Sequence, residues 1–159
     1  MAVAYYHPIK LNIRQAVPGD ADVLARFNVE LARESENLVL DAARVKAGVE
    51  ALLRDPAKGT YFVGESGGAV VGQVLITHEW SDWRNGDFWW LQSVYVRADF
   101  RRRGVFQALF DYVLASAKRQ GDVAGIRLYV EQQNDPALKA YRRIGMKETP
   151  YRVLERLVL

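Results

Sequence analysis

The 159-residue chain contains no cysteine. Without thiols it can form no disulfide, use no thiolate nucleophile and build no cysteine-based zinc site, and the absence suits a cytoplasmic protein. Histidine is almost missing too, because only His7 and His78 are present. Two imidazoles so far apart in the sequence do not suggest a metal centre. We therefore expect a protein that binds no metal.

Long hydrophobic runs are also missing. No apolar stretch approaches the roughly 20 residues of a membrane span, and the N-terminus, where residues 1–8 read as a loose leader, has no signal-peptide core. A large excess of charge is absent as well, since 22 basic and 19 acidic residues leave a net charge of +3. That balance permits an anionic ligand but is weak support for nucleic-acid binding. We expect a cytoplasmic protein that binds neither membranes nor nucleic acid.

What is present is typical of a globular protein. Hydrophobic residues make up 50% of the chain and charged residues 26%, and no repeat or low-complexity linker interrupts it. A chain of this length buries about 68–70% of its unfolded surface, enough for a core of its own. One domain over residues 1–159 is the prediction.

Residues 91–109 combine a strand, a basic turn and a helix. The strand is predicted by β-forming residues in an apolar run around Tyr95. From Val105 onward, apolar residues recur every three or four positions, which is the pattern of an amphipathic helix. The turn between the two holds Arg101, Arg102, Arg103 and Gly104.

This basic turn is a candidate pyrophosphate site. Backbone amides and the positive dipole end at a helix start attract anions, and arginine side chains bind phosphate oxygens through paired hydrogen bonds. Gly104 would let a ligand approach the backbone closely. Each feature alone is common on protein surfaces, and the turn is neither a P-loop nor a G-x-G-x-x-G motif. Together the features predict a phosphate-containing ligand.

The rest of the chain predicts an α/β protein with a mixed sheet and helices on its faces. Hydrophobic periodicity, caps and turns define the elements. We expect strands at 9–16, 61–65, 69–78, 88–96, 126–130 and 151–159 (one strand or two), a loop at 80–87, and helices starting at Asp20 or Asp22, at Asp41, at Val105 and at Asp135.

Three segments together resemble the GNAT superfamily of N-acetyltransferases: Tyr95-Val96, Arg101-x-x-Gly104, and Asn134-x-x-Ala137-x-x-x-Tyr141-x-x-x-Gly145-Met146. The element order fits that family from about Ile9 to the C-terminus. The resemblance implies a mostly antiparallel sheet whose fourth and fifth strands splay apart, with acetyl-CoA between them. The strand before the basic turn would pair with the pantetheine arm. The cofactor-binding residues implied in this way are Val94, Tyr95, Val96, Arg101, Arg102, Arg103, Gly104, Val105, Phe106 and Asn134.

Two positions depart from the family pattern. Phe106 stands where the family has glycine or alanine, but it lies on the apolar stripe of the helix, so we expect its ring to point inward and cofactor binding to survive. Gln92 stands where many members carry a glutamate that deprotonates the amine. An alkylamine with a pKa of about 10.4 is neutral only in about one part in 2,500 at pH 7, so the proton needs another acceptor. Candidates are Glu79, Glu34 or Glu36, or a chain of water molecules, although each carboxylate could be an ordinary surface acid.

Tyr141 is the candidate general acid. The departing CoA thiolate needs a proton, and a phenol can supply it. Tyr141 also lies on an apolar stripe with Ala137 and Ile144, so on the pattern alone it reads as a core residue, and the resemblance favours catalysis. Asn134 would bind the pantetheine arm or the local backbone.

The segment 79–90 is unusually aromatic. Its tryptophans could form a wall of the acceptor pocket, a dimer contact or part of the core. For the acceptor side we single out Glu34, Trp83 and Gln92.

The sequence thus predicts an acetyl-CoA-dependent N-acetyltransferase that acts on a primary amine by direct attack in a ternary complex. The acceptor would be a small molecule or a peptide, and the enzyme could form a homodimer. The alternative is an acyl-CoA-binding GNAT-fold protein with weak or no catalysis, acting as a sensor or on a longer acyl donor. A nucleic-acid binder using the arginines and tryptophans is disfavoured by the evenly spread acidic residues.

Overall fold

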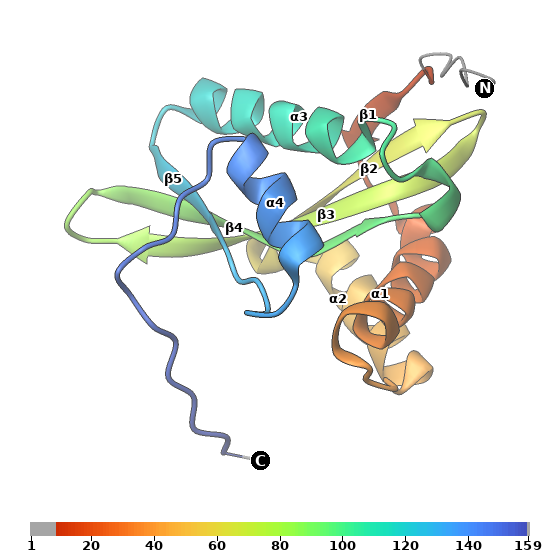
Figure 1. Ribbon diagram of the computed structural model, residues 1–159, viewed down its shortest axis with the longest axis horizontal. Helices are drawn as coiled ribbons and strands as arrows, with labels where there is room; N and C mark the ends of the chain where they lie inside the picture. The colour runs from red at the N-terminus through yellow and green to blue at the C-terminus, as the bar shows by residue number, and fades with distance from the viewer. Residues whose placement is uncertain (1–8, 159) are drawn as a thin grey trace. The chain divides into compact units, whose positions relative to one another are not determined.

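A computed structural model describes residues 9–158 (Figure 1). The predicted leader at 1–8, including His7, and Leu159 lie outside these residues. The predicted order of elements is confirmed as far as the last helix. The elements are β1 (Asn12–Gln15), α1 (Ala21–Glu36), α2 (Ala42–Arg54), β2 (Thr60–Ser66), β3 (Ala69–Ser81), β4 (Gly86–Val96), α3 (Val105–Gln120), β5 (Val123–Leu128) and α4 (Asp135–Arg143).

The five strands form one sheet in the order β1-β2-β3-β4-β5. Strands β1 to β4 pair antiparallel in succession, and β5 runs parallel to β4. The predicted mixed, mostly antiparallel α/β fold is therefore confirmed. The described chain divides into two compact units, one ending at Tyr129 and the other beginning at Val130, which contains α4.

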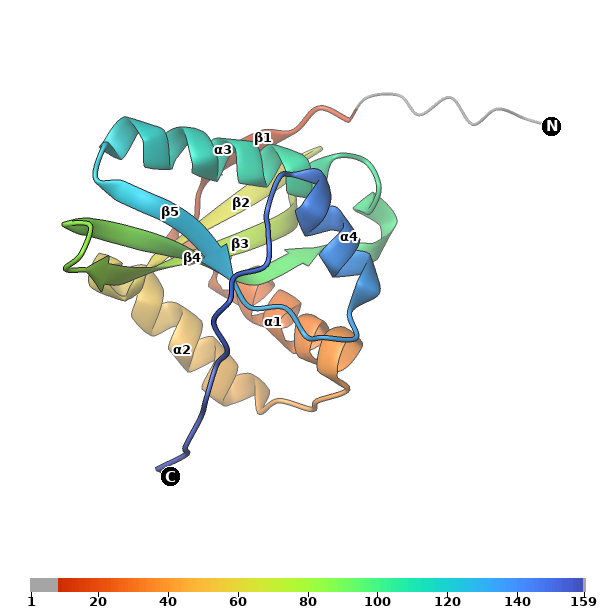
Figure 2. The same cartoon turned by 60° about the vertical axis from the view of Figure 1, so that its left-hand side comes forward.

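Helices cover both faces of the sheet in the first unit. Helix α3 lies on one side, while α1 and α2 lie on the other (Figures 1 and 2). The apolar stripe predicted for α3 is buried, and Leu109 within it is completely so. A side chain at Gly72 in β3 would come within 2.8 Å of Val105. Glycine at this position therefore lets α3 approach the sheet closely.

The capping residues of three helices can be compared with the predictions. Asp41 caps α2 as expected, since its carboxylate accepts hydrogen bonds from the amides of Ala43 and Arg44. Helix α4 begins at Asp135 as expected, and its cap is the preceding residue, Asn134. Asp20 precedes α1, but its carboxylate makes no capping bond to that helix.

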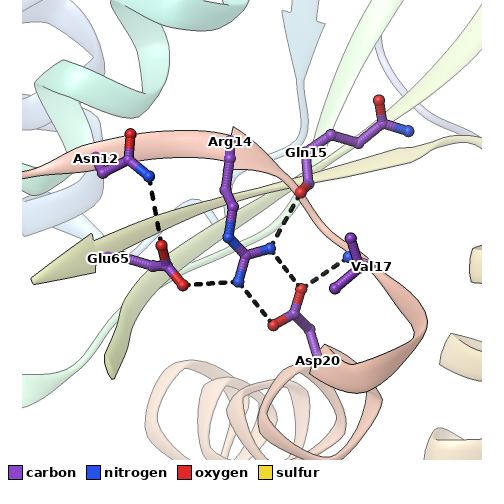
Figure 3. Close-up of polar contacts among 6 residues, drawn as sticks. All are labelled: Asn12, Arg14, Gln15, Val17, Asp20 and Glu65. Atoms are coloured by element: carbon purple, nitrogen blue, oxygen red, sulfur yellow. Dashed lines mark hydrogen bonds and ion pairs between the residues drawn. The ribbon is translucent and has the colours of Figure 1, made fainter. Parts of the chain in front are cut away.

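Instead, Asp20 belongs to an ion-pair network that joins β1, the start of α1 and β2 (Figure 3). Arg14 donates to both carboxylate oxygens of Asp20, at 2.7 and 3.0 Å, and to Glu65 at 2.8 Å. The amide of Val17 also donates to Asp20, at 2.8 Å. These donors, the Arg14 guanidinium above all, lower the pKa of the buried Asp20 carboxyl.

The hairpin between β3 and β4 is longer than the sequence suggested. Residues 80–87 were expected to form a loop, but Trp80 pairs with Asp87 and Ser81 with Gly86. Only residues 82–85 form the turn. The hairpin end carries exposed polar and aromatic side chains, a composition that resembles a loop. The alternation of apolar and polar residues therefore predicted both strands to be shorter than they are.

The predicted closing strand at the C-terminus is wrong for the described residues 151–158. They form no helix or strand, and all are exposed. Apolar side chains here, such as Leu154, are not buried against a sheet. The alternation of apolar and polar residues in this segment therefore does not correspond to a strand. Among the helices of residues 9–158, none is both long and apolar enough to cross a bilayer.

Candidate functional site

The fourth and fifth strands part midway along the sheet, as predicted. They pair in parallel from Asp87 opposite Val123 to Leu91 opposite Leu128. Strand β5 ends there, but β4 continues to Val96. Residues 92–96 therefore have no strand partner on the β5 side within the described chain. Their backbone donors and acceptors form an open edge to which an extended ligand can add.

A β-bulge lies at the start of this open edge. In the β3–β4 ladder, Leu75 is opposite Gln92 and Gln73 is opposite Tyr95, so β4 has one extra residue between these pairs. Ser93, in the extra stretch, has a φ of 49°, in the left-handed region. Bulges bend a strand and redirect its side chains and backbone groups.

Strained backbone occurs at two places in this region. Four described residues other than glycine have positive φ, and two of them are asparagines, which tolerate that conformation. The other two are Ser93 in the bulge and Arg102 in the basic turn, with a φ of 61°. Such a conformation costs about 1–2 kcal/mol per residue. Strain of this kind is concentrated at functional sites.

A partly buried hydrogen-bond network supports the bulge. Gln73 Nε2 donates to the Ser93 carbonyl at 3.1 Å and to Asn28 Oδ1 at 2.7 Å. Asn28 in turn donates to the Tyr61 hydroxyl at 2.9 Å. Gln73 Oε1 is buried without a partner, which costs about 1–3 kcal/mol. We call Asn28, Tyr61, Gln73 and Ser93 the Gln73 network.

The basic turn joins the open edge to α3. All four of its residues are exposed, and Gly104, with a φ of 80°, precedes the helix in the left-handed conformation. The first intrahelical bond recorded for α3 runs from the Ala108 amide to the Gly104 carbonyl at 3.0 Å. The turn therefore leads into a helix N-terminus, which favours anions. Val105 is buried, while Phe106 is half-buried with its ring centre 6.3 Å from that of Phe110.

Arg101 is held by groups of the protein. Its guanidinium forms an ion pair with Glu34 of α1 and donates to the Val96 carbonyl at 2.9 Å. The Tyr95 hydroxyl also donates to Glu34, at 3.2 Å. Burial, followed by the charge of Glu34, raises the pKa of Tyr95. Glu34, which we expected on the acceptor side, thus links α1 to the open edge and the basic turn.

Gln92 and Glu79 project from the same face of the β3–β4 hairpin. Gln92 donates to the Thr77 hydroxyl at 2.6 Å. Glu79 accepts from the Trp90 indole at 2.6 Å and from Arg127 at 3.2 Å. Trp90 stacks on Tyr129 with ring centres 4.4 Å apart. This face therefore combines a carboxylate with an aromatic surface.

Trp83 is placed differently. It lies in the hairpin turn at residues 82–85 and is 85% exposed. No ring contact or side-chain hydrogen bond recorded in the described chain joins it to Glu79 or Gln92. Trp90 and Tyr129, rather than Trp83, make the aromatic surface beside Glu79.

A cavity of about 390 Å³ lies between α1, α2 and the sheet. Ser93 and two other members of the Gln73 network, Asn28 and Tyr61, line it together with Glu36. The rest of its lining is mainly apolar and consists of Leu31, Ala32, Leu40, Val45, Gly48, Val49, Leu52 and Leu75. A pocket of this size suits a small organic group.

Tyr141 and Asn134 belong to the second compact unit. Tyr141 is half-buried on α4, and burial raises its pKa. The Asn134 side chain accepts from the Ala137 amide at 3.2 Å, so it makes the local backbone bond that was one of its two predicted roles. Its contact with pantetheine stays a prediction.

Sequence reasoning missed the Gln73 network. A signal was present, because Gln73 is the one strongly polar side chain within Val70–Ile76. The residues it contacts cannot be found in this way, since Asn28 lies 45 positions away and Ser93 lies 20 away.

Comparison with known proteins extends these observations. Residues 26–146 match the acetyltransferase (GNAT) family. A mycothiol acetyltransferase of Corynebacterium aurimucosum is 34% identical over 108 residues, which cover 66% of this chain and 35% of that protein. An uncharacterized N-acetyltransferase of Methanocaldococcus jannaschii is 32% identical over 89 residues, which cover 55% of this chain and 39% of that protein. The chain thus aligns with only about two-fifths or less of the length of these curated relatives.

Solved structures share the fold. The crystal structure of a possible acetyltransferase from Clostridium difficile 630 is 43% identical and has a TM-score of 0.89, covering 94% of this chain and 98% of that one. A ribosomal-protein-alanine N-acetyltransferase from Brucella melitensis biovar Abortus 2308 is 20% identical, with a TM-score of 0.74 over 93% and 100% of the two chains. At that identity the second match supports the fold alone.

Proposed function

The chain belongs to the GNAT family of acetyltransferases, and from this premise we propose that it transfers an acetyl group from acetyl-CoA to a primary amine by direct attack in a ternary complex. The observation that carries the proposal is the open edge of β4, residues 92–96, which leads through the short 3-10 helix Ala98–Phe100 into the basic turn. An extended pantetheine arm can pair with that edge, and a pyrophosphate can then reach the turn and the first amides of α3.

The proposed cofactor contacts divide by chemistry. Backbone groups of Val94 and Val96 would bind the pantetheine amides, while amides and charges of residues 101–106 would bind the pyrophosphate. Arg101 already forms an ion pair with Glu34. We therefore propose that Arg101 holds the turn in place and that Arg102 and Arg103, the second of which also lies over the Phe100 ring, add positive charge near the phosphates.

Tyr141 is our candidate for protonating the leaving thiolate. Its phenol is protonated at neutral pH, as a hydrogen-bond donor or general acid must be, and burial, which raises its pKa, makes it a weaker acid than a free tyrosine. The amine nitrogen forms its bond to the acetyl carbonyl carbon, the C–S bond breaks, and the sulfur receives the proton. This sequence needs no covalent acetyl-enzyme and no metal.

The proton of the attacking amine needs a separate acceptor. Gln92 cannot serve, because an amide is not a base at neutral pH and its N–H donates to Thr77. We propose Glu79 for this role, directly or through water. Its carboxylate already accepts from Trp90 and Arg127. The Glu79 carboxylate would attract an ammonium group before deprotonation, in exchange for its ion pair with Arg127.

The proposed acceptor is a small-molecule or peptide amine. The face around Glu79 would bind its cationic end, while Trp90 and Tyr129 offer aromatic rings to a cation or an apolar group. The adjoining α1–α2 cavity is mainly apolar and could hold the remainder of the acceptor. We also propose that residues 1–159 form one GNAT domain, since the family match spans both compact units. A cytoplasmic location and a homodimer complete the proposal.

The second candidate function is acyl-CoA binding with weak or no catalysis. Gln92 favours it, because an amide that donates a hydrogen bond to Thr77 stands where many family members have a glutamate that deprotonates the amine. A sensor or an enzyme for a longer acyl donor would share the cofactor site.

An amine panel tests the proposed function. The protein is incubated with acetyl-CoA and polyamines, amino acids, aminoglycosides or peptides, and released CoA is measured with a thiol-reactive dye. The chain has no cysteine, so the protein adds no thiol signal. We expect release that depends on one class of amine. Binding of acetyl-CoA without release for any amine would favour the second candidate.

A further inference from the structure

A polar side chain occupies a position in β3 where packing alone would favour an apolar one. Gln73 is completely buried, and its strand neighbours Val71, Val74 and Leu75 belong to the core. Burial of an amide is unfavourable unless its hydrogen bonds are made, and Gln73 Oε1 has no partner. An aliphatic side chain would avoid that cost. The residue therefore calls for an explanation beyond packing.

The explanation lies in what the Gln73 amide holds. Its Nε2 donates to the carbonyl of Ser93, the residue with left-handed backbone in the β4 bulge. This bond lies where the register between β3 and β4 shifts by one residue. The Gln73 side chain therefore adds a hydrogen bond between the two strands at the point where their backbone pairing is interrupted. Because a carbonyl can only accept, the bond also fixes which end of the Gln73 amide faces β4.

The network is anchored on α1 and β2. Asn28 of α1 accepts from Gln73 and donates to Tyr61 of β2, so the orientation of the Gln73 amide is fixed from two elements outside β4. One bond of the network, from Gln73 Nε2 to the Ser93 carbonyl, reaches β4, so the bulge cannot slide along the strand without breaking it.

We propose that Gln73 is a positioning residue that holds the β4 bulge, and with it the direction of the open edge at 94–96. The inference rests on the proposed function, in which that edge presents the thioester to the amine. Gln73 is fully buried and touches neither substrate. It acts through the Ser93 carbonyl, and its loss should misplace the thioester while leaving the basic turn able to bind phosphate.

Gln73→Met tests the proposal, because methionine has a similar length and no amide. The matched control is Val63→Ala, since Val63 is the completely buried cross-strand neighbour of Gln73 on β2, on the side away from β4. We expect Gln73→Met to lower kcat by roughly 10²-fold, the cost of a misplacement of about 1 Å, and to weaken CoA binding by a smaller factor, because the basic turn still binds the pyrophosphate. Val63→Ala should lower the melting temperature and leave kcat near the wild-type value.

A second readout needs no activity. The backbone amide resonances of Ser93, Val94 and Tyr95 should shift in Gln73→Met and stay in place in Val63→Ala. If Gln73→Met does not fold, Gln73→Asn gives the same comparison, because it keeps the amide but shortens its reach by one methylene. Unchanged resonances at 93–95, or an equal loss of kcat in Val63→Ala, would overturn the proposal. An inactive wild type would refute the proposed function, whereas the resonances would still report on the bulge.

Discussion

Replacement of Gly104 tests where the pyrophosphate binds. Gly104 has a φ of 80°, and a Cβ added there would meet no other atom within 4 Å. Gly104→Glu therefore has two effects. A residue with a side chain must adopt the left-handed backbone, which costs about 1–2 kcal/mol. A negative charge is also placed in the proposed phosphate site. Gly104→Asn is the matched control, because asparagine tolerates the same backbone without adding charge.

The charge effect can be bounded from the exposure of the turn. Two unit charges about 4 Å apart interact by about 1 kcal/mol in water and about 4 kcal/mol near a protein surface. Gly104 is exposed, so we take the lower part of that range, about 1–2.5 kcal/mol. This corresponds to roughly 5- to 60-fold weaker binding of CoA.

Calorimetric titration with CoA measures the effect. The Kd of Gly104→Glu should exceed that of Gly104→Asn by this factor at low salt, and the difference should shrink as salt screens the repulsion. Equal Kd values for the two folded variants would place the pyrophosphate elsewhere and refute the assignment of the basic turn.

Three further predictions concern the reacting groups and acid stability. Tyr141→Phe should retain CoA binding and lose roughly 10²–10⁴ in turnover, the range for a general acid; wild-type turnover would return Tyr141 to a core role. Gln92→Glu should keep or raise turnover of alkylamines near neutral pH, because it adds a proton acceptor, and Glu79→Gln should lower it; a pH–rate profile unchanged by Glu79→Gln would exclude Glu79 as the base. Asp20 has a folded-state pKa below its ordinary 3.8, so it stabilises the protein above that pH and loses this effect as pH falls through the folded value. The melting temperature of Asp20→Asn should therefore fall less steeply below about pH 4 than that of the wild type, and parallel curves would contradict this role.

The sequence predicted elements that depend on local pattern. The α3 stripe starting at Val105 and the Asp41 cap are both visible within a short window. The splay of β4 and β5 came from family resemblance. Predictions based on strand alternation alone failed at the β3–β4 hairpin end and at 151–158, where side chains are exposed on both faces and apolar periodicity carries little information.

Contacts between distant segments could not be predicted in this way. Glu34, predicted beside the acceptor, pairs with Arg101, 67 positions later, and short-range patterns give no sign of this contact. The bulge at Ser93 has no glycine to mark it, and its support comes from Gln73 and Asn28 on other elements. Register slips and buried side-chain bonds depend on how strands align, which short sequence windows do not encode.

The most direct test of acetyl transfer in a ternary complex is the stoichiometry of a single reaction. Wild-type protein is mixed with acetyl-CoA and the most active amine, and released CoA, acetylated amine and the intact protein mass are measured together. We predict one acetylated amine for each CoA released, no release without the amine, and no acetylated protein at any time. CoA release without amine, accompanied by acetylated protein that the amine then consumes, would contradict direct transfer.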